Sequence, residues 1–429
     1  MYKLASSNIE SRNRKAYNTC MWQKLKNIYH LFIALLANIW FGFPSRNIIV
    51  IGVTGTDGKT TTTSLIYHIL KSSGKDASMI SSVGAIINGK KYDVGFHVTT
   101  PSSFGIQKFL KKAAGLPSKN KSFMVLETTS HALDQHRVFG IKFDIGVLTN
   151  VTHEHLDYHK TYDNYLKTKA KLLEMAKVAV INRDDESYKS INSELRIKNL
   201  ELRTYGIGKD ADVNLEIFPF KTKLIGEFNK YNILAAIAVC KQLGISEEEI
   251  RKAIESFSAP LGREDVVYKK DFVVMIDFAH TPNAFEKILS SLRKETKGRI
   301  IHVFGSAGKR DRTKRPLMGK ISSSIADVII LTQEDPRGES IQNINKDIEK
   351  GISKDFEFRD YKSYVDLQDK NVYFKIDSRT EAISFAINVA KKGDLVLLTG
   401  KSHEKSMNYG HGEEPWDEYE AVSKALRQE

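Results

Sequence analysis

The chain contains little cysteine and no long apolar run. Two cysteines, Cys20 and Cys240, in 429 residues cannot form a disulfide framework, and neither belongs to a Cys-x-x-Cys pair. The most apolar stretch, Ile28 to Phe43, is shorter than the ~20 residues that a membrane-spanning helix requires. Internal repeats and low-complexity tracts are also absent from the sequence. What remains is the composition of an ordinary globular protein.

Acidic residues are scarce relative to basic ones. The sequence has 52 Asp and Glu against 65 Lys and Arg, which gives a formal net charge of +13. Such an excess is typical of proteins that meet nucleic acid, an anionic membrane or an anionic substrate. No RNA- or DNA-binding signature accompanies the charge, so we expect no nucleic-acid partner. An anionic substrate, an anionic membrane and a basic solvated surface remain as explanations.

A phosphate-binding loop is the most informative segment that is present. A β-branched run ending at Val53 is followed by Thr54-Gly-Thr-Asp-Gly-Lys-Thr60 and then by a helical pattern. Backbone N–H groups of such a turn wrap phosphate oxygens, and the helix directs its positive N-terminus at the anion. Lys59 supplies a point charge, and the Thr60 hydroxyl supplies a ligand for Mg²⁺. Val53 stands where the common Gly-x-x-x-x-Gly-Lys-Ser/Thr pattern has glycine, so this loop is the shorter Gly-x-x-Gly-Lys-Thr form.

Two successive α/β patterns divide the chain into residues 47–258 and 259–429. Their apolar runs suit strands of a parallel sheet that helices cover on both faces. We predict an α/β fold: a central parallel-sheet P-loop domain that binds ATP, a C-terminal Rossmann-like α/β domain, and a short helical N-terminal segment, 1–46. Ligands bind beyond the carboxyl ends of such strands. The strands expected in the two patterns are 48–53, 122–127, 145–149, 178–182, 272–277, 300–304, 328–332 and 395–399.

Six ordered segments together resemble one enzyme family. The phosphate loop is similar to that of the Mur ligases, the ATP-dependent amide ligases of peptidoglycan synthesis. The resemblance runs from about residue 47 to the C-terminus, and it implies ATP and Mg²⁺ as cofactors. The other five segments resemble the branch that adds the third peptide residue: Glu127-Thr-Thr-Ser-His-Ala-Leu133, Thr149-Asn-Val-Thr-His-Glu-His-Leu-Asp-Tyr-His159, Gly226-Glu-Phe-Asn-Lys-Tyr-Asn-Ile-Leu-Ala-Ala236, Asp277-Phe-Ala-His-Thr-Pro282 and Glu334-Asp-Pro-Arg337.

The resemblance implies a catalytic centre around the phosphate loop. Glu127 ends an apolar strand and needs a cation there, and Mg²⁺ prefers carboxylate oxygens. His155 matches the family's metal-site histidine, whereas the spacing of three nearby histidines alone leaves zinc as an alternative. Lys169 matches a family lysine that CO₂ carbamylates, although without the resemblance its helix is a solvated, lysine-bearing one. The implied catalytic residues are Lys59, Glu127, His155 and Lys169, and the implied metal ligands are Thr60, Glu127, His155 and carbamylated Lys169.

Nucleotide contacts implied by the resemblance come from both halves of the chain. Asn229 and Asn232 begin a helix similar to the family's adenine-side contact, and helix capping explains them equally well without the resemblance. Lys314 and Arg315 lie in a basic loop similar to one that reaches the terminal phosphate. The residues expected at ATP are Gly55, Thr56, Asp57, Gly58, Lys59, Thr60, Thr61, Asn229, Asn232, Asp277, Lys314 and Arg315.

The resemblance also implies sites for a donor and an acceptor. The family's motif for meso-diaminopimelate reads Asp-Asn-Pro-Arg, and Arg337 retains the fork that grips a distal carboxylate. Asp335 replaces the asparagine, so L-lysine stays open as the acceptor, and a phosphate-contacting or structural role stays open for Arg337. Glu404 is expected near the distal ammonium. The donor, a muramoyl dipeptide, is expected at Thr99, Thr100, Ser130, His131 and Arg137, and the acceptor at Glu334, Asp335, Arg337, Gly400 and Glu404.

The first 46 residues combine a basic flank with the apolar stretch from Ile28 to Phe43. Two interpretations stay open: the helix packs on the enzyme, or it lies in a membrane interface with its basic flank on anionic headgroups. A signal peptide would separate the nucleotide site from ATP, so we expect a cytoplasmic protein, with peripheral membrane association as the second interpretation. Known three-domain members carry an N-terminal domain that binds uridine diphosphate. Too few residues precede the loop here for that domain, so we expect a different mode of substrate anchoring.

We therefore predict an ATP-dependent ligase that adds a diamino acid to the D-glutamate of a muramoyl dipeptide through an acyl phosphate. Meso-diaminopimelate is favoured over L-lysine as the acceptor. Three alternatives remain: a ligase or amidating enzyme that acts on lipid-linked precursors, a folylpolyglutamate synthetase, and a non-catalytic nucleotide-binding switch. The synthetase would lack the Glu334 to Arg337 motif, and the switch would release ADP whether or not an amino acid is added.

Overall fold

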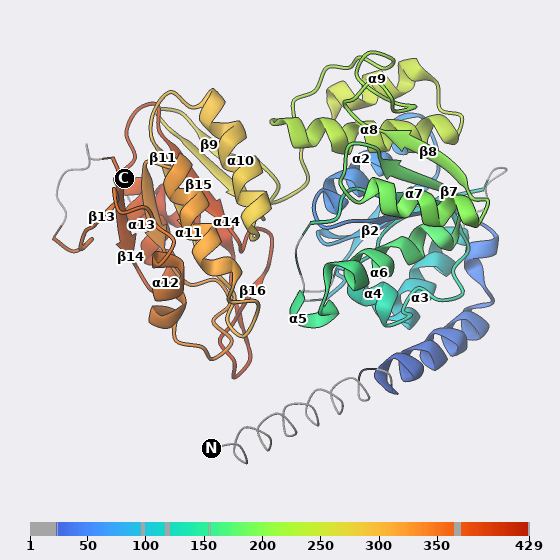
Figure 1. Ribbon diagram of the computed structural model, residues 1–429, viewed down its shortest axis with the longest axis horizontal. Helices are drawn as coiled ribbons and strands as arrows, with labels where there is room; N and C mark the ends of the chain where they lie inside the picture. Colours follow the sequence, from blue (N-terminus) through green and yellow to red (C-terminus); the bar gives the residue numbers. More distant parts are fainter. Residues whose placement is uncertain are drawn as a thin grey trace, which may run out of the picture.

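Two α/β lobes lie side by side in the computed structural model, and a single helix extends along the first lobe (Figure 1). The structure describes residues 23, 25–95, 99–115, 121–152, 154, 156–363 and 370–427. The predicted division between residues 258 and 259 falls in the loop that joins α9 (Glu247–Ser256) of the first lobe to β9 (Asp265–Lys269) of the second. Among the described residues, no helix combines the length and the apolarity needed to cross a bilayer.

The first lobe is built on an eight-stranded sheet of order β4-β3-β2-β5-β1-β6-β7-β8. Strands β2, β5, β1, β6, β7 and β8 are mutually parallel, whereas β3 and β4 pair antiparallel at one edge. The predicted α/β class is confirmed; the antiparallel edge was not expected. The strands are β1 (Ile49–Thr54), β2 (Ala77–Ser81), β3 (Gly84–Ile87), β4 (Lys90–Tyr92), β5 (Phe123–Glu127), β6 (Phe143–Leu148), β7 (Ala176–Asn182) and β8 (Glu201–Tyr205).

Helices cover both faces of this sheet. Ile51 and Val53 of β1 point to one face, where they pack with residues of α2, α8 and α9 in one buried cluster. Val50 points to the other face and packs with residues of α3 and α4. Because both faces are buried, the strands read as continuous apolar runs in the sequence. The helices are α2 (Lys59–Ser72), α3 (Ser103–Ala114), α4 (Ser130–Asp134), α5 (Leu156–His159), α6 (Tyr162–Glu174), α7 (Tyr188–Ile197), α8 (Glu227–Gln242) and α9, with the 3-10 turn η1 (Pro44–Arg46) before β1.

The second lobe repeats the layered plan with a seven-stranded sheet of order β13-β14-β12-β11-β15-β10-β9. Its strands are parallel except β9, which pairs antiparallel with β10. One buried cluster joins the sheet to α13 and α14, and a second joins it to α10, α11 and α12. The elements are β10 (Val273–Asp277), α10 (Pro282–Glu295), β11 (Ile300–Phe304), α11 (Lys314–Ile325), β12 (Val328–Leu331), α12 (Ile341–Glu349), β13 (Glu357–Phe358), β14 (Val372–Lys375), α13 (Arg379–Asn388), β15 (Leu395–Thr399), β16 (Ser406–Asn408), β17 (Glu413–Pro415) and α14 (Glu418–Ala425).

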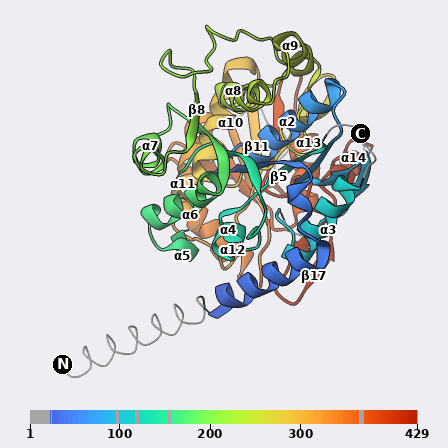
Figure 2. The ribbon, with the colours of Figure 1, turned by 90° about the vertical axis from the view of Figure 1, so that its right-hand side faces the viewer.

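A helix over residues 25–41, named here the N-terminal helix, lies against the first lobe. Figures 1 and 2 show it below α3 and α4, at the margin of the molecule. The ring of Phe41 packs on that of Phe104 in α3, with centroids 6.1 Å apart. The helix expected within Ile28 to Phe43 is therefore observed, and it rests on the P-loop lobe.

Candidate active site

A cavity of about 900 Å³ lies between the two lobes. From the first lobe it is lined by the phosphate loop, the segment after β2, the end of β5 and two residues within α6. From the second lobe it is lined by the end of β10 and residues 403–405, which follow β15. The carboxyl ends of strands from both sheets therefore face one space, as expected for ligand sites of open α/β sheets. The predicted residues that line it are Gly55, Thr56, Asp57, Gly58, Lys59, Thr60, Thr61, Thr99, Thr100, Glu127, Ser130, His131, Arg137, Lys169, Asn229, Asn232, Asp277, Arg337 and Glu404.

The phosphate loop is shaped by its close contact with α8. Gly58 has φ +78°, and a Cβ at this position would lie 2.1 Å from Oδ1 of Asn232. Only glycine meets both constraints, because L residues rarely adopt this φ and the space is already filled. Helix α2 begins directly after it at Lys59, with no side chain capping its N-terminus. The first backbone N–H groups of α2 therefore have no side-chain acceptor, and they lie where the phosphate loop lines the cavity. This is the geometry of an anion-binding site.

Oxygen ligands for a hard cation gather beside the loop. The Thr60 hydroxyl lies 2.8 Å from the Ser82 hydroxyl and donates to Oε1 of Glu127 at 3.1 Å. The other Glu127 oxygen accepts the Ser82 backbone N–H at 2.9 Å. The Arg263 guanidinium lies 3.3 Å from both hydroxyls, so this oxygen cluster already attracts a cation. Hydroxyl and carboxylate oxygens are the donor set that suits Mg²⁺.

The predicted histidine ligand cannot be placed. His155 lies outside the described residues, and so does His153. Within the described ranges, no three His, Cys, Asp or Glu side chains converge as a metal-binding group. The third histidine, His159, is buried, and its Nε2 lies 3.1 Å from the Ser130 hydroxyl.

Lys169 is the buried lysine of its helix. It is 1% exposed, and its Nζ donates to the Gly55 carbonyl at 2.6 Å and lies 4.5 Å from the centre of the Tyr165 ring. Burial, reinforced by the nearby charge of Lys59, holds the pKa of Lys169 well below its usual value. Lys167, by contrast, forms an exposed ion pair with Asp163. The helical spacing therefore sends one lysine into the phosphate site and leaves another in solvent.

Two asparagines of α8 link the loop to the second lobe. Asn232 donates to Oδ1 of Asn229 at 3.0 Å, and Asn229 donates to both carboxylate oxygens of Glu264 at 2.9 and 3.0 Å. Burial, with Asp277 close by, raises the pKa of Glu264 to about 8. The backbone N–H of Glu264 donates to Asp277 at 2.8 Å. The asparagines are therefore not caps of α8; they belong to a polar network on the wall of the cavity.

The residues expected at the donor lie together at one end of the cavity. Thr100 donates to the Glu127 carbonyl at 3.1 Å, and Arg137 donates to the Thr100 carbonyl at 3.3 Å. The His131 ring packs on Tyr158, with centroids 4.2 Å apart. Ser130 begins α4, and its hydroxyl contacts His159. These contacts hold hydroxyl, imidazole and guanidinium groups on one wall next to Glu127.

One predicted phosphate contact is placed elsewhere. Arg315 has a fully buried side chain that pairs with Glu339 at 2.8 Å and with Asp347 at 3.1 Å, and it does not line the cavity. A buried guanidinium with two carboxylates is a structural ion pair within the second lobe. Lys314 is near the cavity but donates to the His280 carbonyl at 2.8 Å. From the same basic loop, Arg310 reaches the cavity wall in their place.

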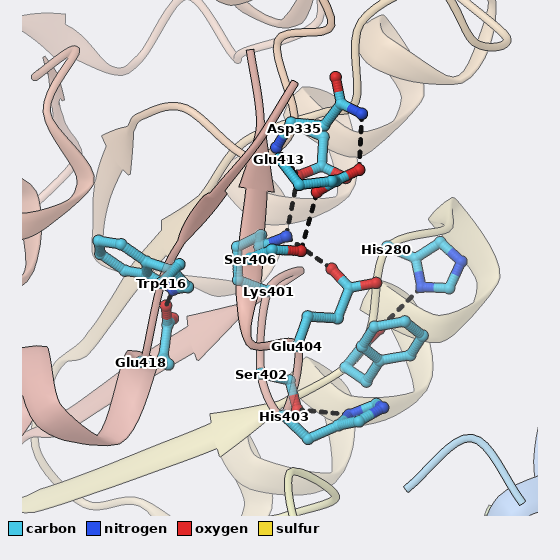
Figure 3. Close-up of polar contacts among 12 residues, drawn as sticks. His280, Asp335, Lys401, Ser402, His403, Glu404, Ser406, Glu413, Trp416 and Glu418 are labelled. Atoms are coloured by element: carbon cyan, nitrogen blue, oxygen red, sulfur yellow. Dashed lines mark hydrogen bonds and ion pairs between the residues drawn. The ribbon is translucent and has the colours of Figure 1, made fainter. Parts of the chain in front are cut away.

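Two of the predicted acceptor residues, Asp335 and Glu404, form ion pairs with the buried Lys401 (Figure 3). Lys401 has a fully buried side chain, and its Nζ donates to Asp335 at 2.8 Å and to Glu404 at 2.7 Å. Asp335 also accepts from Arg337 at 3.2 Å. Burial opposes the charge of Lys401, but the two carboxylates outweigh it and raise its pKa. The negative charge of Asp335 is therefore compensated by Lys401 in addition to Arg337.

The remaining acceptor residues, Glu334 and Gly400, lie against each other. A Cβ on Gly400 would be 2.9 Å from the Glu334 carboxylate, and the glycine has φ +100°. Neither residue lines the cavity. The structure therefore places Arg337 and Glu404 at the cavity, whereas Glu334 and Gly400 are not among the residues that line it.

Several cavity residues were not predicted from the sequence. Arg263 and His403 approach the phosphate site from the second lobe: His403 Nε2 lies 3.1 Å from the Ser82 carbonyl, and Nδ1 lies 3.4 Å from Arg263. Burial, with Arg263 beside it, lowers the pKa of His403 to about 3, so its ring is neutral. Across the same gap, His280 lies 3.5 Å from Glu154, and both belong to segments that carried the resemblance, Asp277 to Pro282 and Thr149 to His159. The charged Gly262-Arg-Glu264 turn after α9 was the signal available in the sequence.

Comparison with known proteins identifies relatives across most of the chain. The sequence profile of the Mur ligase middle domain matches residues 53–240, and that of the Mur ligase glutamate ligase domain matches residues 262–402. The UDP-N-acetylmuramoyl-L-alanyl-D-glutamate–2,6-diaminopimelate ligase of Aquifex aeolicus is 39% identical over 410 residues, covering 91% of this chain and 80% of the relative. Ligase 1 of the same description from Clostridium acetobutylicum is 34% identical over 417 residues, covering 92% of this chain and 82% of the relative.

Solved structures show the same architecture. A 2,6-diaminopimelate ligase of the same description is 28% identical and superposes with a TM-score of 0.57 over 89% of this chain and 78% of the other. FolC of E. coli in complex with DHPP and ADP superposes with a TM-score of 0.66 over 92% of each chain, at 18% identity. At that identity the second likeness concerns the fold alone.

Proposed function

The chain belongs to the Mur ligase family, and from this premise we propose that it is an ATP-dependent ligase that joins meso-diaminopimelate to a muramoyl dipeptide. The observation that carries the proposal is the shared cavity. A phosphate loop with its cation-binding oxygens faces, across the same space, an arginine and a glutamate from the other sheet. The relatives of 34% and 39% identity, which are named as 2,6-diaminopimelate ligases, support the same substrate pair.

The reaction proceeds in two displacements. A carboxylate oxygen of the donor's D-glutamate attacks the γ-phosphorus of ATP, the bond to the β-γ bridging oxygen breaks, and ADP leaves. The acceptor amine then attacks the acyl phosphate carbon, inorganic phosphate leaves, and the amine loses a proton as the amide forms. Lys59 and the N-terminus of α2 hold the phosphates, and the network of Asn229, Asn232 and Glu264 lines the nucleotide side. The protein supplies positioning and charge stabilisation rather than a covalent intermediate.

The oxygen cluster supports Mg²⁺ as a cofactor. Thr60 and Glu127 would hold the ion, with Ser82 beside them, and the predicted ligand His155 stays a prediction. When bound, Mg²⁺ would neutralise charge on the phosphate oxygens. The Arg263 guanidinium, which lies 3.3 Å from Thr60, brings a second positive charge to the same place.

Carbamylation of Lys169 is part of the proposal. The reaction requires an unprotonated amine, and burial of Lys169 lowers its pKa well below the usual value. The nitrogen of the neutral amine bonds to the carbon of CO₂, one N–H proton is released to solvent, and the neutral amine becomes an anionic carbamate. Such an anion would lie near the charge of Lys59, on the wall of the cavity that the oxygen cluster also lines. It would add a second carboxylate-type ligand in addition to Glu127, since no three His, Cys, Asp or Glu side chains converge there among the described residues.

Acceptor selection is assigned to Arg337 and Glu404. Arg337 lines the cavity with a partly exposed side chain, so its fork is accessible to a carboxylate. Lys401 compensates the charge of Asp335, which removes the objection that Asp335 repels an anionic substrate. Glu404 lines the same wall and is assigned to the distal ammonium. L-Lysine has that ammonium but lacks the distal carboxylate, so Arg337 favours meso-diaminopimelate.

The function is tested by identifying the product by mass. The enzyme is incubated with ATP, Mg²⁺ and meso-diaminopimelate, and with either nucleotide-linked or lipid-linked muramoyl dipeptide. The proposal expects ADP and a product heavier by one diaminopimelate residue with at least one donor. A folylpolyglutamate synthetase would extend a folate instead, and a nucleotide switch would release ADP without any amino acid dependence. Either result would show that the proposed ligase function is wrong.

A further inference from the structure

The N-terminal helix turns its apolar face away from the protein. Among the described residues, fifteen large apolar side chains are substantially exposed, and eight of them lie on this one helix. Their spacing of three and four residues places them on one side of the helix. Trp40 is 78% exposed and Ile39 is 65% exposed. The eight residues, named here the outer stripe, are Leu25, Ile28, Tyr29, Phe32, Leu35, Leu36, Ile39 and Trp40.

Polar and small residues dock the opposite side of this helix on the first lobe. The buried Asn38 donates to the Phe139 carbonyl at 2.8 Å and accepts from Gln107 of α3 at 3.0 Å. Asn27 donates to Asp134 of α4 at 3.2 Å. Ala34 and Ala37 are fully buried at the contact. Rotating the outer stripe inward would leave Asn38 and Gln107 without these partners, at the cost of buried unsatisfied polar groups. The orientation is therefore fixed by hydrogen bonds.

We propose that the outer stripe docks the protein on the surface of an anionic lipid bilayer. Its aliphatic side chains suit the acyl boundary, and Tyr29 and Trp40 combine an apolar ring with a polar atom, which suits the headgroup level. Because the opposite side of the helix is bound to the lobe, the helix lies along the bilayer surface. This contact goes beyond the proposed function and does not depend on it.

The basic residues near the outer stripe favour an anionic lipid surface over a second protein copy as its occupant. Residues 1–46 contain seven Lys or Arg and a single acidic residue, Glu10; of the basic residues, Lys26 and Arg46 lie in the described part of the chain. Lys108 and Lys111 follow Phe104 at helical spacing in α3, so the basic character continues on the neighbouring helix. A second copy of the chain is the competing occupant of the stripe. Pairing two copies through it would bring these like charges together, whereas anionic headgroups would neutralise them.

The test is sedimentation of the full chain with vesicles of phosphatidylglycerol and, separately, of phosphatidylcholine. We expect binding to phosphatidylglycerol at low salt, weaker binding as salt rises, and little binding to phosphatidylcholine. A triple variant of the outer stripe, Ile28→Gln, Phe32→Gln and Trp40→Gln, should lose on the order of a hundredfold in vesicle affinity, because three apolar insertions are removed.

The matched control replaces three apolar residues that are comparably exposed elsewhere: Ile217→Gln, Leu317→Gln and Phe358→Gln. It should bind vesicles like the unmodified protein. Both variants should keep the unfolding temperature of the parent, because the replaced side chains are exposed. The proposal is overturned if the parent stays in the supernatant with phosphatidylglycerol, or if both variants lose binding equally. It is also overturned if the parent is a dimer that the outer-stripe variant converts to a monomer without any vesicle binding.

Discussion

Removing the Arg337 guanidinium should change acceptor selectivity more than overall activity. In the structure its side chain is 26% exposed at the cavity wall, and its Nη2 lies 3.2 Å from Asp335. Arg337→Ala deletes the fork that we assign to the distal carboxylate of meso-diaminopimelate. L-Lysine has no such carboxylate, so the same change should affect its use far less.

The magnitude follows from the type of contact. A hydrogen bond to a charged group contributes roughly 1.5–3 kcal/mol, which is about ten- to a hundredfold in the ratio of kcat/KM values. The substitution should leave the fold intact, because Asp335 keeps Lys401 at 2.8 Å and the Asn408 N–H at 3.1 Å. The positive φ of 52° at position 337 is equally strained for arginine and alanine, since both carry a Cβ.

The assay is amino-acid-dependent phosphate release with each acceptor. Arg359→Ala is the control, because Arg359 pairs with Glu357 at 2.8 Å and is 43% exposed outside the cavity. It should leave both kcat/KM values unchanged. Equal losses for the two acceptors in Arg337→Ala would show that the arginine does not read the distal carboxylate. A parent enzyme that prefers L-lysine would refute the assignment directly.

Three further changes test other parts of the site. Lys169→Ala should abolish ligation, and a small carboxylic acid should restore part of it by supplying the missing anion; full activity without the acid would leave Lys169 without a carbamate role. Lys401→Met should lower the free energy of unfolding by roughly 3–5 kcal/mol in chemical denaturation, because Asp335 and Glu404 lose their buried cation. Glu264 has a pKa raised from 4.5 to about 8, so its stabilisation is present in full below pH 4.5 and is lost as pH rises toward 8. As pH rises from 4.5 to 8, the unfolding temperature of Glu264→Gln should therefore fall less than that of the parent. If the two proteins lose the same amount, the pKa of Glu264 is not raised.

Local patterns predicted most of the strands that are buried on both faces, although β2, which is also fully buried, was missed. The strand before the phosphate loop was expected at 48–53 and is observed as Ile49–Thr54. A short apolar run followed by a glycine turn is compatible with few structures other than a buried strand. The short antiparallel strands β3 and β4 were missed. Lys90–Tyr92 is three residues long and mostly exposed, so it carries no run of apolar residues.

The sequence predicted those site residues that lie within one short motif. It did not predict the contacts that form between the two lobes. Lys59 and Thr60 follow from their place after a glycine turn. Arg263 contacts Thr60 across 203 positions of sequence, and although the Gly262-Arg-Glu264 turn is charged, its sequence does not specify which residue of the other lobe it meets. For Arg315 the sequence predicted a contact that the structure does not form. The basic loop indicated a phosphate contact, but the side chain donates to the carboxylates of Glu339 and Asp347, which are distant in the sequence.

The most direct measurement is the mass of the product made from muramoyl dipeptide, ATP and meso-diaminopimelate, with Lys59→Ala and Glu127→Ala run beside the parent. We expect the tripeptide product and stoichiometric ADP with the parent, and neither product with the two folded variants. Near-normal turnover in both variants, or ADP formed at the same rate without the amino acid, would contradict this expectation.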